Sequence, residues 1–398
     1  MEDLSTVPSG CSDSSSTPIV VIGAGLAGLV AAKSLQRRGY RVLVLEKSLG
    51  TGGRLNSRRI DGVRADRGVR YLDGSLPLTA ELIQPLVEQG LVQRWAGTGF
   101  QYSQSKLDAV ATHDRYCAPE GISQVAKALA QGVDVRFNHR AIALTPHFSD
   151  LEANPSEQLW TVYCDHPRSE PLRGEPKPLQ DEISAATLIV TIPAPQAEGL
   201  LATLDAGRYQ KALDLLQIVS PVRYNPCFTV TATYAPARDL DPPALRNWQG
   251  IELLNDSALA WIAREDRKSS GSDRPVVGLQ SSAEFAERWV DSQDLYPIGR
   301  QLLAQAEQIF NLPFRHPQAF QVHCWRYAQA INPLAQPYLH DESSNLWIGG
   351  DWCGGNDVEG ALASGLAIAD AVDQAHGTNG INPSLADLVS PFAKAAAS

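Results

Sequence analysis

The chain has 398 residues, of which 43% are apolar and 20% are charged, a globular composition that excludes overall disorder. The length predicts about two to three structural units, because a unit usually contains about 100–200 residues. Acidic residues outnumber basic ones by 44 to 34, and the net charge of −10 argues against a general nucleic-acid-binding surface.

Six cysteines are scattered along the chain, and no two of them have the spacing of a Cys-x-x-Cys motif. The spacing therefore indicates neither a cysteine-based zinc site nor a vicinal redox pair, and no metal site is predicted. The absence of a dense cysteine framework favours a reducing compartment.

The longest uncharged apolar stretch covers residues 18–32, which is shorter than the roughly 20 residues of a membrane span. Glu2 and Asp3 precede it without any Lys or Arg, which argues against a secretory signal. We therefore expect a cytoplasmic protein that binds neither membranes nor nucleic acids.

In chain order, the serine-rich residues 1–17 predict a flexible tail. The β-branched run 19–22 predicts a buried parallel strand, and the glycine-rich turn 23–28 follows it. A helix is expected over 26–38 and a second strand over 41–46. The unit is thus strand, glycine turn, helix and strand, and it ends in the carboxylate Glu46.

Local patterns predict further elements along the chain. We expect helices around 79–89, 121–131 and 358–374, and strands at 133–137, 159–164, 187–192 and 346–348. The proline-rich segment 166–178 is interpreted as an exposed hairpin insertion, and no internal repeat is present.

The first glycine motif predicts a dinucleotide-binding turn. Gly23 permits the tight turn, Gly25 lets the backbone approach a pyrophosphate, and Gly28 lets the helix pack closely on the sheet. The backbone at Leu26 and Ala27 would face the anion, where the helix dipole is favourable. Glu46, followed by Lys47, would accept the ribose hydroxyls. The alternative is a glycine-rich turn in an ordinary α/β unit.

Two later elements make FAD the expected dinucleotide. Gly52-Gly53-Arg54 supplies a second glycine pair and a guanidinium for phosphate. Gly350-Asp351 follows a strand, and Asp351 could hold the ribityl chain. The helix that begins near 358 could direct its first turn, Glu359, Gly360 and Ala361, at the flavin. The alternatives are a surface Gly-Gly turn and a helix packed tightly on the sheet.

In amine oxidases, whose Gly-Asp element Gly350-Asp351 resembles, the cysteine that links the flavin precedes this element. Cys353 follows it, so we expect FAD to be bound non-covalently. Val135, in the strand 133–137, is similar in position to the residue whose backbone contacts adenine in related flavoproteins, which implies such a contact here, and an ordinary strand residue is the alternative.

Together these elements resemble the glutathione-reductase type of FAD fold, which implies an α/β fold with a Rossmann-like FAD-binding domain and an inserted α+β substrate domain. We expect the FAD-binding domain to be discontinuous and to be followed by a C-terminal tail. The predicted segments are 1–17 for the tail, 18–75, 112–200 and 340–375 for FAD binding, 76–111 and 201–339 for the substrate domain, and 376–398 for the C-terminal tail.

Over residues 18–375 these motifs resemble the branch of FAD proteins that contains amine oxidases, phytoene desaturases and renalases. The tract from Thr51 to Arg58, continued by residues 65–71, is similar to the renalase form of the motif. Renalase-like proteins also carry segments similar to Trp261-Ile262-Ala263-Arg264 and His323-Cys324-Trp325-Arg326-Tyr327. The chain departs from that pattern at 1–17, at 166–178 and at Lys268-Ser269-Ser270-Gly271.

The resemblance implies oxidation of dihydro isomers of NAD(P), with hydride transfer to FAD and reoxidation by O2 to give hydrogen peroxide. It also implies the residues of the catalytic site. We expect an aromatic wall over the flavin from Trp261, Trp325 and Tyr327, orienting groups from Arg264, Arg326 and His323, and an approach of Tyr71 to the ring. Core packing is the alternative for each of these residues.

Six arginines within 17 residues give one further observation in favour of an anionic substrate. One would serve the FAD pyrophosphate, and the others could attract the phosphates of a second dinucleotide. A solvated basic strand with ion pairs is the alternative. The six are Arg54, Arg58, Arg59, Arg64, Arg67 and Arg70.

Two other functions stay open. An amine oxidase or desaturase of the same fold is disfavoured because no lysine between 200 and 350 has a clear buried-strand context, whereas amine oxidases commonly place a lysine near the flavin. A flavin-bound assembly or sensor protein with little catalysis would instead be recognised by a stoichiometric partner and no turnover.

Overall fold

The computed structural model describes residues 17–95, 99–104, 106–110, 114–147, 159–167, 181–205, 209, 211–236, 238–241, 248–269, 273–377 and 382–390. The predicted tail, apart from Thr17, and most of the predicted insertion 166–178 lie outside these residues.

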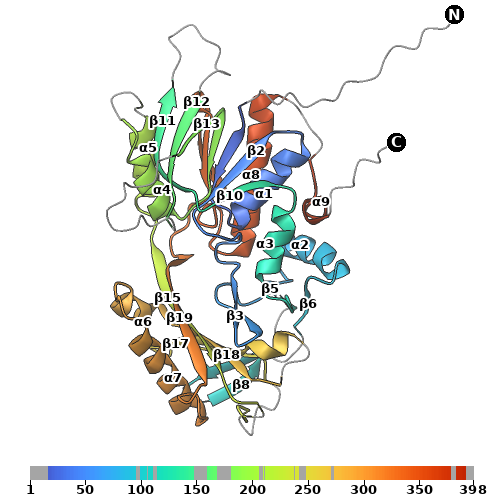
Figure 1. Ribbon diagram of the computed structural model, residues 1–398, viewed down its shortest axis with the longest axis vertical. Coiled ribbons are helices and arrows are strands. Elements are labelled where there is room, and N and C mark those ends of the chain that lie inside the picture. The colour runs from blue at the N-terminus through green and yellow to red at the C-terminus, as the bar shows by residue number, and fades with distance from the viewer. Residues whose placement is uncertain are drawn as a thin grey trace, which may run out of the picture.

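A six-stranded sheet of mostly parallel strands organises the first unit (Figure 1). Every residue of the strands that begin at Ile19, Val42, Thr187 and Leu346 is buried, because both faces of the sheet are covered. The final pair is antiparallel. The order is β10 (Asp134–Phe137), β2 (Val42–Glu46), β1 (Ile19–Ile22), β14 (Thr187–Val190), β21 (Leu346–Gly349) and β20 (Tyr338–Asp341).

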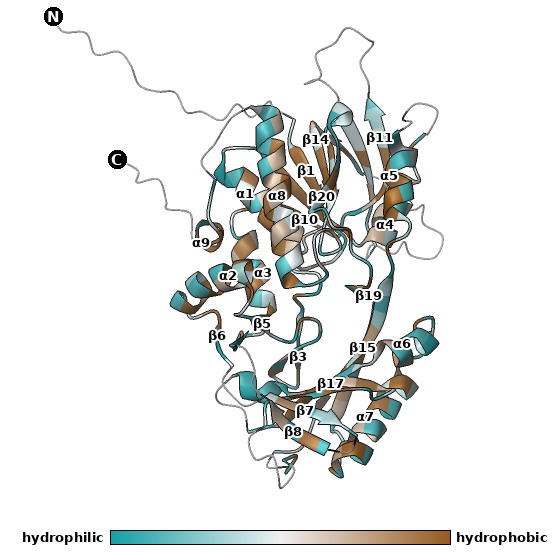
Figure 2. Cartoon of the chain, turned by 180° about the vertical axis from the view of Figure 1, so that it is seen from behind, coloured by the Kyte–Doolittle hydropathy of each residue, from teal (hydrophilic) through white to brown (hydrophobic). Residues whose placement is uncertain are grey.

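One face of this sheet is covered by helices and the other by a second layer that contains strands. Figure 2 shows β1 and β14 in the colour of apolar residues between these layers. The first layer holds α1 (Leu26–Arg37), α2 (Pro77–Glu88), α3 (Ser123–Ala130), α8 (Val358–His376) and α9 (Leu385–Val389). The second holds β11 (Arg140–His147), β12 (Leu159–Asp165), β13 (Asp181–Ala185), α4 (Ala194–Leu201) and α5 (Lys211–Val219).

A seven-stranded sheet forms the second unit, and two of its strands are long enough to extend towards the first unit (Figure 1). Helices α6 (Ala283–Trp289) and α7 (Tyr296–Phe310) cover one face. The order is β19 (Ala319–Ala330), β15 (Tyr224–Thr233), β18 (Val276–Ser281), β17 (Leu259–Arg264), β16 (Gly250–Leu253), β7 (Gly99–Ser103) and β8 (Lys106–Val110).

Short strands lie between the two large sheets in Figure 1. They form the hairpin of β3 (Ser57–Ile60) and β4 (Val63–Asp66), and a small sheet of β5 (Leu72–Asp73), β9 (Arg115–Cys117) and β6 (Gln93–Arg94). The predicted α/β fold with a Rossmann-like unit and a second α+β unit is therefore confirmed.

The packing differs from the predicted boundaries at three places. Helices α2 and α5, which the sequence assigns to the substrate domain, pack with the first unit. Helix α9 lies within the expected C-terminal tail, and Leu385, Leu388 and Val389 are buried against the first helical layer. Apolar side chains spaced for a single helix face explain this docking.

Among the described residues, every helix is too short or too polar to cross a membrane.

The contact between α1 and α8 requires a glycine in α8. A Cβ at Gly365 would lie 2.5 Å from the carbonyl oxygen of Ala27 and 2.9 Å from Cβ of Val30. We expect Gly365→Ala to lower the free energy of unfolding by about 1–3 kcal/mol through overpacking, as measured by urea unfolding.

Gly199→Ala provides the matched control, since a Cβ at this position of α4 would have no heavy atom within 4 Å. This variant should gain about 0.5–1 kcal/mol from helix propensity. Equal or greater stability of Gly365→Ala than of the wild type would contradict the packing argument.

Candidate active site

Two glycine-rich turns meet at the end of the first unit's sheet. Gly25 and Gly52 form a parallel bridge, and the amide of Gly52 donates a hydrogen bond to the carbonyl of Ala24 at 2.7 Å. Gly52 has φ +107° and Gly53 has φ +55°, which favour glycine. A Cβ at Gly52 would lie 2.5 Å from the carbonyl oxygen of Leu55 and 2.9 Å from Cβ of Ala126, so this turn has no room for a side chain.

The three glycines of the first motif have different surroundings. A Cβ at Gly28 would lie 2.1 Å from the carbonyl oxygen of Gly23, so this position serves helix–strand packing. Gly23 has φ +104° and makes the turn. A Cβ at Gly25 would meet no heavy atom of the described residues within 4 Å, so open space adjoins this backbone.

This open space lies at the N-terminus of α1, where Leu26 and Ala27 are the first helical residues. Within the described part of the chain no side chain caps the helix, and its first turn carries no acidic residue. Uncapped amides and the helix dipole attract an anion. The residues therefore fit a pyrophosphate.

The carboxylate of Glu46 lies beside the glycine turn and is buried. Its Oε2 accepts a hydrogen bond from the amide of Ala24 at 2.9 Å, and its Oε1 accepts one from the amide of Ser48 at 2.8 Å. Each oxygen retains capacity for a further donor, such as a ribose hydroxyl. Lys47 points elsewhere and lies 3.4 Å from the amide oxygen of Gln196.

Arg54 and Asp351, which the sequence assigns to the pyrophosphate and to the ribityl chain of the coenzyme, contact each other directly. The guanidinium donates to both carboxylate oxygens at 2.6 Å and to the carbonyl of Ala328 at 3.1 Å. Although burial lowers the pKa of Arg54, the charge and hydrogen bonds of Asp351 raise it above its ordinary value. The pair joins the second glycine motif to the Gly-Asp turn, where Gly350 has φ +140°.

Hydrogen-bonding groups in the first turn of α8 have partners within the protein. Asp357 caps the helix, since its side chain accepts a hydrogen bond from the amide of Gly360 and its carbonyl accepts one from the amide of Ala361. The carboxylate of Glu359 accepts hydrogen bonds from the amides of Leu78 and Thr79 at the start of α2. Contacts of Glu359, Gly360 and Ala361 with flavin therefore stay predictions.

Val135 lies in β10, opposite Val44 of β2, at the edge of the sheet beyond Glu46. Its predicted contact with adenine also stays a prediction. Open space at Gly25, the uncapped helix and the accessible capacity of Glu46 together fit FAD, held through its pyrophosphate and ribose.

The second unit presents a different set of side chains towards the first. In β19, His323 and Trp325 share one face, because side chains alternate along a strand. The pairing of β19 with β15 is irregular between Trp325 and Gln329, and the ring of Tyr327 lies 5.7 Å from that of Tyr224. The side chain of Arg326 is half exposed and pairs with Asp291 at 2.8 Å, so it does not join His323 and Trp325.

Residues 67–70 cross the face of the second sheet. The carbonyl of Arg67 accepts hydrogen bonds from Thr229 Oγ1 and Trp325 Nε1, both at 2.7 Å. The carbonyl of Gly68 accepts one from the side-chain amide of Gln280, also at 2.7 Å. The segment that follows the second glycine motif is therefore fixed to β15, β18 and β19.

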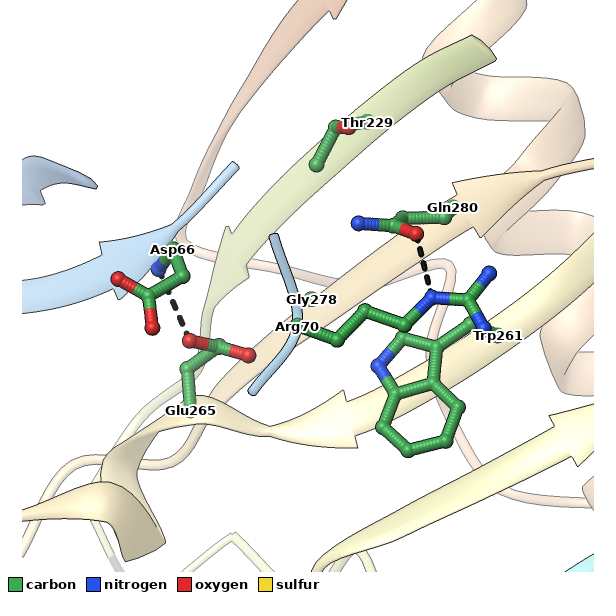
Figure 3. A pocket seen from close by; sticks show the side chains of 7 residues that line it. All are labelled: Asp66, Arg70, Thr229, Trp261, Glu265, Gly278 and Gln280. Atoms are coloured by element: carbon green, nitrogen blue, oxygen red, sulfur yellow. Dashed lines mark hydrogen bonds between the residues drawn. The ribbon is translucent and has the colours of Figure 1, made fainter. Parts of the chain in front are cut away.

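Figure 3 shows the small pocket at this crossing, which has room for about one water molecule. Arg70 Nε donates to the side-chain oxygen of Gln280 at 2.7 Å, and its guanidinium lies 5.0 Å from the ring centre of Trp261. Burial lowers the pKa of Arg70. The lining residues are Asp66, Arg70, Thr229, Trp261, Glu265, Gly278 and Gln280.

An aromatic cluster extends from this pocket. Tyr71 lies 6.3 Å from Trp95 and 6.0 Å from Trp261, between ring centres, and Arg115 lies 4.5 Å from the centre of the Tyr71 ring. Trp95, Arg115 and Gln280 are not among the site residues predicted from the sequence. Only strand alternation, which puts Gly278 and Gln280 of β18 on one face, offered a signal for any of them.

Arg264 is buried but faces carboxylates. It donates to both oxygens of Asp266, at 3.0 and 2.8 Å, and to Asp241 at 2.8 Å. These ion pairs balance the positive charge of Arg264 within the second unit. Its predicted orienting role is not supported by a contact with the pocket.

A buried triad links the two units beside the pocket. Lys268, in the 3-10 helix Glu265–Lys268, donates to Asp66 at 2.9 Å and to the carbonyl of Arg70 at 2.9 Å, and pairs with Glu265 at 3.0 Å. Although burial lowers the pKa of Lys268, the two carboxylates raise it above its ordinary value. The ammonium group is thus committed to three oxygen atoms.

Some arginines of the tract match the predicted solvated basic strand, and Arg70 does not. Arg58 and Arg59 are exposed on β3, and Arg64 lies 3.7 Å from Glu120, as expected of a solvated basic strand. Arg70 instead enters the pocket. Arg67 donates to the side-chain oxygen of Asn56.

His323 lies close to this positive region, with its ring 4.3 Å from that of Trp325. Burial, together with the charges of Arg67 and Arg58, lowers the pKa of His323 to about 4. The neutral imidazole therefore does not add to the positive charge at neutral pH.

Comparison with protein families gives two matches. Residues 21–86 match the NAD(P)-binding Rossmann-like domain, and residues 90–373 match the flavin containing amine oxidoreductase family.

Local similarity to curated proteins covers about a fifth of their length. A proposed flavin-containing monoamine oxidase, AofH of Mycobacterium tuberculosis, is 40% identical over 92 residues, which are 21% of this chain and 20% of that protein. The phytoene desaturase of Fusarium fujikuroi is 34% identical over 98 residues, or 22% of this chain and 17% of the desaturase.

Putrescine oxidase bound to putrescine is similar in structure. The TM-score is 0.63 at 14% identity, with 90% of this chain and 99% of the oxidase covered. At this identity the likeness concerns the fold alone.

The position of Glu46 gives a test of FAD binding. We expect Glu46→Arg to purify without FAD and Glu46→Gln to bind FAD roughly 10-fold more weakly, because the ribose loses a charged acceptor. The ratio of flavin to protein absorbance measures occupancy. Glu88→Arg makes the same charge change at an exposed position and should retain FAD. Full occupancy in Glu46→Arg would contradict this placement of the ribose.

The lowered pKa of His323 predicts a pH dependence of stability. The unfolded state binds a proton near pH 6.5 and the folded state only near pH 4, so this contribution to stability is complete above pH 6.5 and is lost as the pH falls towards 4. His323→Gln should therefore lose less Tm than the wild type between about pH 7 and pH 5. His340→Gln, at an exposed position, controls for removal of an imidazole. Identical pH profiles for wild type and His323→Gln would contradict the prediction.

Proposed function

The chain belongs to the family of flavin containing amine oxidoreductases, and from this premise we propose that it oxidises dihydro isomers of NAD(P). The proposed reaction converts the dihydro isomer, one proton and O2 into NAD(P)+ and hydrogen peroxide. Bound FAD supplies the two-electron acceptor for this chemistry. The protein has to bind the substrate, orient it and exclude water.

The two guanidinium groups that lie against the aromatic rings are the observation that supports this substrate class. Arg70 and Arg115 lie against the rings of Trp261 and Tyr71, while Lys268 is bonded to the nearby carboxylates of Asp66 and Glu265. Guanidinium groups attract the phosphates of a nucleotide and repel a protonated amine.

The aromatic residues suit the other half of such a substrate. Trp261 is buried, and its ring, together with those of Tyr71 and Trp95, forms an apolar surface beside the arginines. Because the pocket has room for about one water molecule, a planar dihydropyridine ring would reach these rings only after local movement of side chains, and the rings would then exclude water from it. We therefore assign binding and orientation to Arg70, Arg115, Trp261 and Tyr71, with Trp325 holding the crossing segment through the carbonyl of Arg67.

Amine oxidation or desaturation is the second candidate, favoured by the local similarity to AofH and to the phytoene desaturase. An amine oxidase commonly places a lysine near the flavin. Lys268 is the buried lysine beside the pocket, and its three contacts with Asp66, Glu265 and the carbonyl of Arg70 leave it no free donor. The lack of a free donor on Lys268 favours a nucleotide substrate over an amine.

Anaerobic mixing of the purified FAD-bound protein with the 2- and 6-dihydro isomers of NAD and NADP tests the proposal. We expect the visible flavin absorbance to bleach within seconds and to return on admission of O2, with formation of hydrogen peroxide. No bleaching with any isomer would overturn the proposal, and reduction by a panel of amines instead would support the second candidate. A single stoichiometric protein partner without reduction by any donor would favour an assembly or sensor role.

In the same assay, Arg70→Gln should weaken isomer binding roughly 10- to 100-fold, because a charge-assisted contact contributes about 1.5–3 kcal/mol. Arg70→Lys, which keeps the charge but not the planar contact, should fall between Arg70→Gln and wild type. Arg300→Gln removes an exposed guanidinium on α7 and should leave binding unchanged. Equal FAD content in all variants separates substrate binding from coenzyme loss.

A further inference from the structure

Three potential metal ligands converge at the outer edge of the first unit. His139 lies in the turn between β10 and β11, His166 follows β12, and Asp181 begins β13. Strand pairing brings them together, since Arg140 lies opposite Asp165 and Cys164 lies opposite Asp181. One ligand atom of each lies within 4.8 Å of the other two.

The hydrogen bonds of the two imidazoles fix the direction of their lone pairs. Nδ1 of His139 lies 2.8 Å from the carbonyl oxygen of Phe137, and Nδ1 of His166 lies 3.0 Å from that of Asn138. A carbonyl oxygen only accepts, so each Nδ1 carries the hydrogen. In the neutral ring Nε2 then has the free lone pair.

Both Nε2 atoms face the same carboxylate oxygen. Oδ2 of Asp181 lies 3.0 Å from Nε2 of His139 and 3.2 Å from Nε2 of His166. An ionised carboxylate only accepts, so with neutral imidazoles three lone pairs converge with no hydrogen between them, and either a proton on an imidazole or a bound cation has to bridge them. Imidazoles that donate Nδ1–H to a backbone carbonyl while Nε2 faces a metal are the usual arrangement of metal-binding histidines.

We propose that His139, His166 and Asp181 bind a divalent transition metal, with Zn2+ as the best match. Two imidazole nitrogens and one carboxylate oxygen are common zinc ligands, and bonds of about 2.0–2.1 Å give a tetrahedral edge of about 3.3 Å, close to the two separations that involve Asp181 Oδ2. The side chain of Asp181 is 45% exposed, which leaves solvent access for a fourth ligand. The neighbouring carboxylate of Asp165 pairs with Arg140 and does not compete.

The metal would fasten the outer three-stranded sheet to the dinucleotide-binding sheet. The amide of His139 donates to the carbonyl of Glu46 at 2.9 Å, and that of Asn138 donates to the carbonyl of Ser48 at 3.0 Å. The site thus ties the ends of β12 and β13 to the turn behind the ribose-binding carboxylate. Its role is structural and is independent of the substrate.

The test uses the full-length FAD-bound protein without a polyhistidine tag, freed of metal by a chelator and titrated with ZnCl2. We expect about one zinc ion per chain by calorimetry and by elemental analysis after dialysis, and a rise in Tm of roughly 3–6 °C with excess zinc. His166→Ala and Asp181→Asn should lose at least about 10-fold in zinc affinity and most of the Tm rise.

His147→Ala is the matched control, because His147 lies in β11 of the same sheet and its Nε2 contacts Thr161 instead. This variant should bind zinc like the wild type. Failure of the wild type to bind zinc, or equal binding by His166→Ala, would overturn the proposal. A Tm that does not change on addition of zinc would also overturn the proposal. The cluster would then consist of histidine–carboxylate ion pairs.

Discussion

Close contact between two backbones is the constraint from which the coenzyme site is built. The turn at Gly25 and the turn at Gly52 pair through their backbones, and Gly52 has no room for a Cβ because Leu55 and Ala126 lie against it. Their contact directs the following residue, Arg54, towards Asp351, which comes from the far end of the chain. Three segments that are distant in sequence thereby surround one space, with the uncapped start of α1 at its base.

The same tract then carries the coenzyme unit into the substrate unit. After Arg54, the hairpin of β3 and β4 leads to Asp66, which meets Lys268 and Glu265, and to Arg67 and Gly68, which are held by side chains of the second sheet. The charges at this junction are buried and mutually satisfied, so each is costly to remove alone. The pocket at Arg70 and Trp261 lies beside this junction, and its shape depends on both units.

Much of the first unit could be predicted from the sequence because its signals are local. The glycine spacing, the apolar run at 19–22 and the carboxylate at Glu46 each reflect a requirement met within a few residues. The second unit was less predictable, because its site residues depend on strand pairing across long separations. Lys268 looked polar and ordinary in sequence, yet its partner Asp66 lies about two hundred residues earlier.

If the strand over residues 319–330 had been recognised in the sequence, the alternation of its side chains would have predicted that Trp325 and Arg326 lie on opposite faces. The His139–His166–Asp181 cluster had no such signal, because its ligands follow no metal-binding spacing and meet only through the pairing of β11, β12 and β13.

The crossing of residues 67–70 also limits how far the two units can separate. A hinge that moved the two units apart would have to break the hydrogen bonds of Thr229, Gln280 and Trp325 at once, together with the Lys268 ion pairs. The two units are therefore held as one frame, and the small pocket between their contacts changes shape more easily through its own side chains than by separation of the units.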